Sequence, residues 1–219
     1  MRLQLGKCDL MDIEQLGINT TELGQREKAL LQIIVDENLS NFTFDGLKRK
    51  SRLHPETLSR ILDRLEDEDI LTRMDSLDGR VAGYAVTASA KRLLRMNRLS
   101  SGKPDFQLLK TLMPPHVSAR EILPDLIGRW FGALRWLGYS EDESGVVLKW
   151  ISEDGIQLDA VFSNGELRIT TRLEKEEALG EALRLAYQLI GNIARRFSRA
   201  DWIKPVGYFY EFYPHALAA

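Results

Sequence analysis

The chain has 219 residues, of which 44% are hydrophobic and 28% are charged, and its net charge is −2. These values are typical of a globular protein, so they exclude a disordered chain and argue against a generic binder of polyanions. No apolar run approaches the roughly 20 residues of a membrane helix, and the N-terminus lacks the apolar core of a secretory signal, so we expect no membrane partner and a cytoplasmic location.

Residues that bind metals or perform catalysis are sparse. Cys8 is the single cysteine and cannot form an intramolecular disulfide, and His54, His116 and His215 lack the spacing of metal ligands. The sequence has no phosphate-binding glycine loop, serine elbow or paired-histidine helix. We therefore predict no metal site, no cofactor, no catalytic residues and no enzyme activity.

The order of the segments predicts two domains. The first spans residues 1–99, a Ser/Gly/Pro linker spans residues 100–104, and the second domain spans residues 105–219. Residues 43–100 hold 12 Lys and Arg against 9 Asp and Glu, whereas residues 1–42 and 104–219 are each acidic by 3 charges. The basic surface of the protein is therefore expected in the first domain.

The first domain opens with a helix predicted over residues 22–37. Its apolar stripe places Leu23, Leu30, Ile33 and Ile34 toward a core, and Asn38 is a suitable end. Phe42 is expected in a short strand, and residues 44–50 are expected to form a short helix.

A second helix is predicted over residues 55–68. Pro55 suits the first helical position, and four apolar residues recur at helical spacing, namely Leu58, Ile61, Leu62 and Leu65. The opposite side carries short hydroxyls and arginines. Together with the helix before it and a turn of about three or four residues, this segment predicts a helix-turn-helix.

A hairpin follows the second helix. Residues 70–74 and 81–86 have the composition of strands, and Asp78 and Gly79 between them supply the chemistry of a turn. Thr87 is then expected to cap a basic helix that contains Lys91, Arg92, Arg95 and Arg98.

These residues resemble the winged-helix family of multiple-antibiotic-resistance (MarR-type) transcriptional regulators and their archaeal relatives. The resemblance covers about residues 22–99 and is carried by Thr57, Ser59 and Arg60, by Asp78 and Arg80, and by Val86 and Thr87. It implies sequence-specific binding of double-stranded DNA by a homodimer that is often released by a small ligand. Family members continue from the wing into long dimerising helices, whereas this chain reaches the break at residues 100–104, so neither the dimer mode nor the ligand pocket carries over.

The winged-helix arrangement assigns a role to each exposed polar residue. The recognition helix, residues 55–68, would enter the major groove, where His54, Thr57, Ser59 and Arg60 read bases. Backbone phosphates would be bound by Lys48, Lys50, Arg52 and Arg64. The wing, residues 71–86, would meet the backbone or the minor groove through Arg73 and Arg80.

Two other interpretations remain open for the first domain. Residues 48–52 could be an ordinary solvated helix end, because cations are favoured at helix C-termini. The whole domain could also be an adaptor that docks onto protein within transcription or chromosome machinery, since a fold does not fix a function. The acidic residues 66–69 support the adaptor hypothesis.

The second domain is predicted to be α+β, with a helix, a three-stranded antiparallel meander and a long helix. A short helix over residues 105–117 is followed by a helix that begins at Pro124 and is closed by Gly138. Three strands, residues 146–152, 156–162 and 166–173, are separated by Asp154-Gly155 and Asn164-Gly165. The long helix is expected over residues 174–197.

Aromatic residues are dense in the second domain. Trp130, Trp136, Trp150 and Phe162 would either line a pocket for a flat effector or form an aromatic core, which the pattern favours. The long helix carries apolar residues on more than one stripe, so we expect the second domain to pair two protomers into a homodimer.

Overall fold

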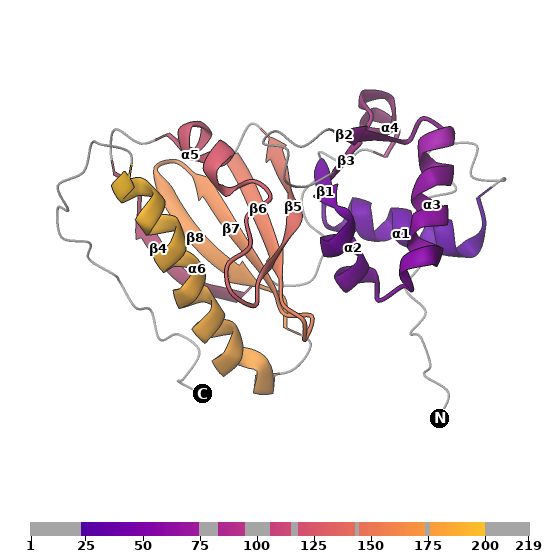
Figure 1. Ribbon diagram of the computed structural model, residues 1–219. Coiled ribbons are helices and arrows are strands. Elements are labelled where there is room, and N and C mark those ends of the chain that lie inside the picture. Colours follow the sequence, from indigo (N-terminus) through magenta and orange to yellow (C-terminus); the bar gives the residue numbers. More distant parts are fainter. Residues whose placement is uncertain are drawn as a thin grey trace.

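The computed structural model describes residues 23–74, 83–94, 106–114, 118–142, 145–173 and 176–199. Within these residues the protein belongs to the α+β class and contains one antiparallel sheet, whose strands follow the order β2-β3-β1-β5-β6-β7-β8-β4 (Figure 1). The sheet runs through both halves of the chain. Hydrogen bonds between strands therefore connect the two halves directly.

The first half contributes four helices and three short strands among the described residues: α1 (Gln25–Asp36), β1 (Asn41–Thr43), α2 (Phe44–Ser51), α3 (Pro55–Asp67), β2 (Leu71–Met74), β3 (Gly83–Val86) and α4 (Ala88–Leu93). The helices and strands expected in this half are confirmed where the structure describes them, with ends that differ by up to three residues, whereas Asp78 and Gly79 of the predicted turn and Arg95 and Arg98 of the predicted basic helix lie outside the described residues. Asn38 ends α1 in the left-handed conformation, with φ 49°, and the hydroxyl of Thr87 caps α4 by accepting from the N–H of Ala90.

In its described parts the second half contributes five strands, two α-helices and one short 3₁₀ helix: β4 (Phe106–Leu112), α5 (Ala119–Leu126), β5 (Arg135–Asp142), β6 (Gly145–Ile151), β7 (Gln157–Ser163), β8 (Glu166–Thr171), η2 (Glu176–Ala178) and α6 (Leu179–Arg199). The predicted meander, here β6-β7-β8, and the long helix are confirmed. Gly155, Asn164 and Gly165 adopt positive φ at the two turns, as the hairpin dipeptides predict.

Strand β1 joins the two halves, because it pairs with β3 on one side and with β5 on the other. The approach at this junction is close. A Cβ on Gly138 would lie 2.2 Å from the carbonyl oxygen of Asn41, and a Cβ on Gly46 would lie 2.5 Å from the Cα of Leu137. Glycine at these two positions therefore lets β1, α2 and β5 pack directly on one another.

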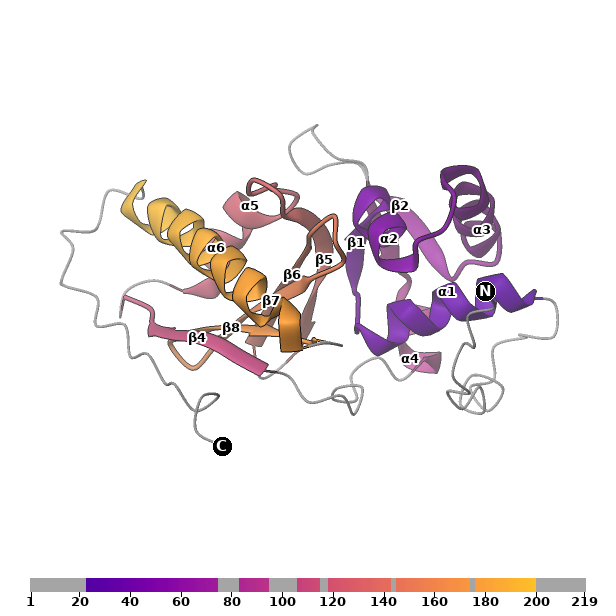
Figure 2. The same cartoon turned by 90° about the horizontal axis from the view of Figure 1, so that it is seen from below.

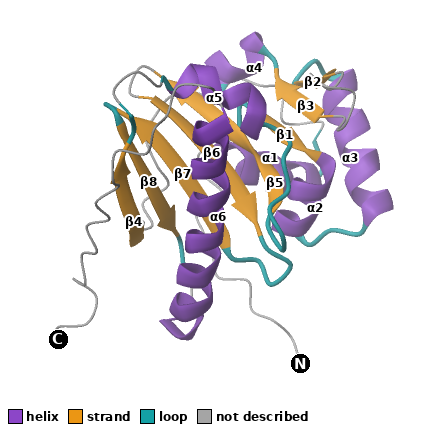
Figure 3. Cartoon of the chain, turned by 60° about the vertical axis from the view of Figure 1, so that its left-hand side comes forward, coloured by secondary structure: helices purple, strands orange, loops and turns teal. Residues whose placement is uncertain are grey.

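Two apolar clusters fill the two halves. The first half packs α1, α2 and α3 around buried leucines and Phe42, and it also takes in Leu137 and Ile151 from the second half. In the second half α5 and α6 lie on the same face of the sheet (Figures 2 and 3) and cover a cluster that contains Trp136, Trp150 and Phe162. The first cluster is therefore completed by residues of the second half.

Two predicted helices are in fact strands. Of the residues expected to form a helix over 105–117, Phe106–Leu112 form β4, in which Leu109 is buried whereas Phe106 and Leu112 are exposed. The helix expected from Pro124 to Leu137 is wrong beyond Leu126. In β5, Trp136 faces the second cluster and Leu137 faces the first, and a strand buried on both faces reads as a continuous apolar run.

The start of α5 was also predicted wrongly. Ser118 and Glu121 form a reciprocal capping box, so the helix begins at Ala119 and passes through Pro124. The proline is tolerated because it is exposed and near the end of a short helix, where it removes one hydrogen bond from the helix. No helix among the described residues is both long enough and apolar enough to cross a membrane.

Candidate functional site

Helix α3 projects on the side of the first half that lies farthest from α5 and α6 (Figures 1 and 2). Its inner stripe is fully packed, because Leu58, Ile61, Leu62 and Leu65 are all buried. Pro55 occupies the first turn, and the turn before it contains Arg52 in the left-handed conformation, with φ 55°. The helix is therefore held rigidly while its opposite side faces away from the protein.

The four residues predicted to read bases lie at the N-terminal end of this outer side. His54 and Arg60 are exposed, and Thr57 and Ser59 are half-buried. Arg60 makes no ion pair or hydrogen bond with any described residue. A guanidinium without an internal partner can donate to an external acceptor without first breaking a bond.

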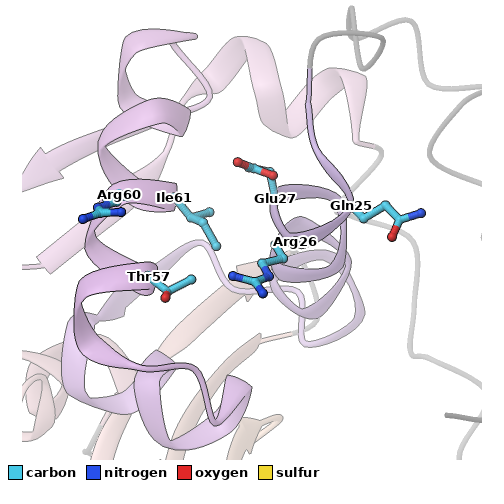
Figure 4. A pocket seen from close by; sticks show the side chains of 6 residues that line it. All are labelled: Gln25, Arg26, Glu27, Thr57, Arg60 and Ile61. Atoms are coloured by element: carbon cyan, nitrogen blue, oxygen red, sulfur yellow. The ribbon is translucent and has the colours of Figure 1, made fainter. Parts of the chain in front are cut away.

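A hollow of about 360 Å³ separates the start of α1 from α3 (Figure 4). We call it the α1–α3 hollow, and it is lined by Gln25, Arg26, Glu27, Thr57, Arg60 and Ile61. Arg26 is exposed and extends across the hollow toward Thr57, whereas Arg60 projects outward from α3. The sequence prediction did not include Arg26, because nothing in the pattern of α1 indicates that its first turn lies beside α3.

The residues predicted to bind phosphates fall into different environments. Arg52 is exposed at the turn before α3. Lys48 is half-buried, and its Nζ lies 3.7 Å from the carboxylate of Asp45. Arg64 is exposed, and its guanidinium lies 3.7 Å from Glu27. These three side chains lie at the protein surface, with weak ion pairs at Lys48 and Arg64.

The prediction for Lys50 is wrong. Its Nζ lies 2.7 Å from Oε1 of Glu37 and donates to Oε1 of Gln157 at 2.7 Å, so it faces the second half of the chain and not a ligand. Its neighbour Arg49 donates to Oε1 of Glu153, at the tip of the β6–β7 hairpin, at 3.0 Å. Arg49 and Lys50 therefore both bind carboxylates that lie outside α2 in the protein itself.

Lys50 belongs to a buried polar cluster between the two halves, which consists of Glu37, Lys50, Lys149, Gln157, Asp159 and Arg172. Lys149 donates to Asp159 and reaches Glu37 at 3.5 Å. Gln157 donates to Glu37 at 2.7 Å and to Asp159 at 2.9 Å. The cluster therefore combines three cations with two carboxylates, and hydrogen bonds link them all.

The pKa of Glu37 reports the balance of forces in this cluster. Burial alone raises the pKa, but the charges of Lys149 and Lys50 and the hydrogen bonds from Lys50 and Gln157 outweigh it and lower the pKa to about 2. Glu37 is therefore a carboxylate at neutral pH. It ties the end of α1 to β6 and β7, and the neighbouring cations favour its ionised form.

Of the two wing residues predicted to meet DNA, only Arg73 lies within the described residues, and Arg80 lies outside them. Arg73 is exposed, but it donates to Glu66 at 2.8 Å and also to Asp63, both on α3. The hydrogen bond to Glu66 contributes most to raising the pKa of Arg73. Strand β2 is therefore tied to the side of α3 opposite the α1–α3 hollow.

The effector pocket predicted from four aromatic residues is not formed by them. Trp136, Trp150 and Phe162 are at most 2% exposed and belong to the second cluster, where the Trp136 and Trp150 rings meet edge to face at 5.1 Å. Trp130 alone is exposed, with the Arg135 guanidinium 4.2 Å from its ring centre. The alternative of an aromatic core is correct for the three buried rings.

Among the residues that the structure describes, no group of three or more His, Cys, Asp and Glu side chains is placed to hold a metal ion. Compared with models of protein families and with curated protein sequences, the chain matches none.

Proposed function

We propose that the protein is a non-enzymatic, sequence-specific regulator of transcription that binds double-stranded DNA as a homodimer in the cytoplasm. The succession α1-β1-α2-α3-β2-β3 is the order of a winged helix, which supports the MarR-type resemblance of residues 22–99. In this proposal α3 enters the major groove, and the wing follows the adjacent backbone or minor groove.

The observation that carries the proposal is the position of Arg60. It lies on the outer side of the rigid helix α3, it is exposed, and no described residue pairs with it. Arginine is the commonest side chain to read guanine in the major groove, since its fork donates to O6 and N7 together. His54, Thr57 and Ser59 lie near it at the end of α3 that would enter the groove first.

The set of residues proposed to hold phosphates is narrower than the sequence indicated. Arg52, Lys48 and Arg64 remain, because their side chains are at the surface. Lys50 is removed, because its ammonium group is bound inside the buried polar cluster. Arg73 is proposed to position the wing against α3, and the two readers of a dimer would meet half-sites about 34 Å apart.

The test begins with selection of bound duplexes from a random library by the full-length protein. We expect enrichment of a two-fold symmetric site, and light scattering of the complex should give two chains per duplex. Affinity should fall steeply with salt, with a log–log slope of about 0.9 per phosphate neutralised. Failure to enrich any duplex above the random pool would refute the proposal.

The role of Arg60 is tested by Arg60→Ala, with Arg120→Ala on α5 as a control that removes the same charge from the other half. Arg60→Ala should reduce discrimination at one or two base pairs by about 1–3 kcal/mol per pair. Arg120 is 83% exposed and belongs to α5, a helix that lies far from α3 (Figure 1), so its variant should retain the preference of the wild type. Equal preference in both variants would remove Arg60 from the base-reading set.

A protein-docking adaptor is the second candidate, because acidic side chains interrupt the basic surface. Glu56 and Asp67 are exposed on α3 itself, and Asp63 is half-buried there. A photo-crosslinking amino acid at Thr57, irradiated in cells, separates the two functions. Adducts with DNA support the regulator, whereas a single protein adduct and no DNA adduct supports the adaptor.

A further inference from the structure

We infer that the α1–α3 hollow binds one backbone phosphate of the duplex and that Arg26, on α1, is the side chain that holds it. This inference rests on the proposed function and adds to it a contact from a different helix. Arg26 and Arg60 line the same hollow of about 360 Å³, together with the neutral side chains of Gln25 and Thr57 (Figure 4).

The chemistry of the hollow suits a phosphate. The Arg26 guanidinium is exposed and makes no ion pair or hydrogen bond within the part of the chain that the structure describes. It is directed toward Thr57, whose side chain also lines the hollow, whereas the Gln25 side chain extends to the opposite side of α1 (Figure 4). A planar guanidinium fork beside a neutral hydroxyl matches the oxygens of a phosphodiester.

The one carboxylate in the hollow does not cancel this charge. Glu27 lies 3.7 Å from the guanidinium of Arg64, one turn along α3 from Arg60. Among the residues that line the hollow, Arg26 and Arg60 supply two positive charges against the single negative charge of Glu27. The lining therefore keeps a positive excess, and the carboxylate of Glu27 is itself in contact with Arg64.

The position of Arg26 distinguishes a phosphate contact from base reading. Arg60 projects from the outer side of α3, whereas Arg26 comes from a helix that flanks α3. When a recognition helix occupies the major groove, elements beside it meet the sugar–phosphate strands that form the walls of that groove. A contact from Arg26 should therefore add affinity for every sequence and no preference among them.

The experiment uses the full-length protein and the duplex enriched by the wild type. Fluorescence anisotropy is measured between 50 and 200 mM NaCl for the wild type, Arg26→Ala, Arg26→Lys and the charge-matched control Arg120→Ala. Each protein is also tested on duplexes with single base-pair changes. Thermal melting of each variant confirms that the fold is retained, as expected for exposed side chains.

We expect Arg26→Ala to lower the log–log salt slope by about 0.9, the loss of one phosphate contact, and to weaken all duplexes by the same factor. Arg26→Lys should keep the slope, since the charge remains, and Arg120→Ala should also keep it. An unchanged slope in Arg26→Ala, or a changed ranking of the duplexes, overturns the inference and leaves the proposed function standing. Absence of binding by the wild type overturns both.

Discussion

The first half of the chain contains two pairs of basic side chains that differ in whether a carboxylate of the protein neutralises them. Arg49 and Lys50, at the end of α2, turn toward the second half and bind Glu153 and Glu37. Arg26 and Arg60 line the α1–α3 hollow and have no partner among the described residues. The first group stabilises the junction of the two halves, and the second is left for an external ligand.

This contrast shows that the local density of Lys and Arg does not identify a binding surface. A cation contributes to binding DNA only if it is not already neutralised, and neutralisation depends on residues distant in sequence. If the inward group is structural, changes in the buried polar cluster should affect stability far more than changes in the hollow, where substitutions should stay within about 0.5 kcal/mol. The predictions below are ordered by the expected loss of stability.

The largest effect is expected for Lys149→Met, which removes the most buried cation of the cluster. Its side chain is 4% exposed, and its loss leaves Glu37 and Asp159 buried with less compensation. Breaking a buried ion pair on one side costs about 3–5 kcal/mol. Urea unfolding at pH 7, followed by tryptophan fluorescence, measures the change.

Lys110→Met is the matched control for this prediction. Lys110 also pairs with a carboxylate, Glu166, at 2.7 Å, but the two side chains are 39% and 30% exposed. A surface pair contributes about 0–1 kcal/mol. Equal destabilisation by the two variants would show that the buried polar cluster has no special role.

The next effect is a dependence of stability on pH through Glu37. Its pKa is lowered from 4.5 to about 2 by folding, so its contribution to stability is present above pH 4.5 and is lost as the pH falls from 4.5 through 2. The full contribution is about 3 kcal/mol, at about 1.4 kcal/mol for each pH unit of the difference. Somewhat more than half of this contribution should be lost by pH 3.

Unfolding free energies of the wild type and Glu37→Gln, measured from pH 6 to pH 3, test this prediction. The difference in unfolding free energy between the two proteins should shrink as the pH falls. Below pH 4.5 the Glu37 side chain takes up a proton in the unfolded chain, which lowers the stability of the wild type, whereas the glutamine does not titrate. A difference that stays constant over this range would mean that folding does not change the pKa of Glu37, which would contradict the prediction.

A smaller effect is expected for Gly46→Ala in α2. The new Cβ would lie 2.5 Å from both the Cα of Leu137 and the carbonyl oxygen of Trp136, so the backbone of the junction must move. Overpacking of this kind costs about 1–3 kcal/mol. Gly191→Ala in α6 is the control, since nothing lies within 4 Å of its new Cβ. The melting temperature should fall in Gly46→Ala and rise in Gly191→Ala, because at an unobstructed helical position alanine is more favourable than glycine by about 1 kcal/mol.

The sequence predicted those elements whose pattern is local. Pro55 and the spacing of Leu58, Ile61 and Leu65 were sufficient for α3, and Asn164-Gly165 was sufficient for the β7–β8 turn. It did not predict β5, because Trp136 and Leu137 are buried on opposite faces of one strand and no alternation remains. Periodicity cannot separate such a run from a buried helix.

The candidate site was predicted only in part, for a related reason. The exposure of Arg60 could be predicted, because the spacing of the apolar residues identifies the buried side of α3. The inward orientation of Lys50 depends on Glu37 and Gln157, and the exposure of Arg26 beside α3 depends on how two helices pack. Contacts between segments so far apart leave no signature in the order of the residues.

The position of β1 between β3 and β5 has a consequence for synthesis on the ribosome. When β3 and α4 emerge, β5 has not yet been made, and both Leu137 and Lys149 are still missing from the contacts that complete the first half. The nascent segment would expose one edge of β1, and Glu37 would have Lys50 but neither Lys149 nor Arg172 as a partner. We therefore expect this half to reach its final stability only after β7 has left the exit tunnel, which makes the protein fold as one late cooperative unit.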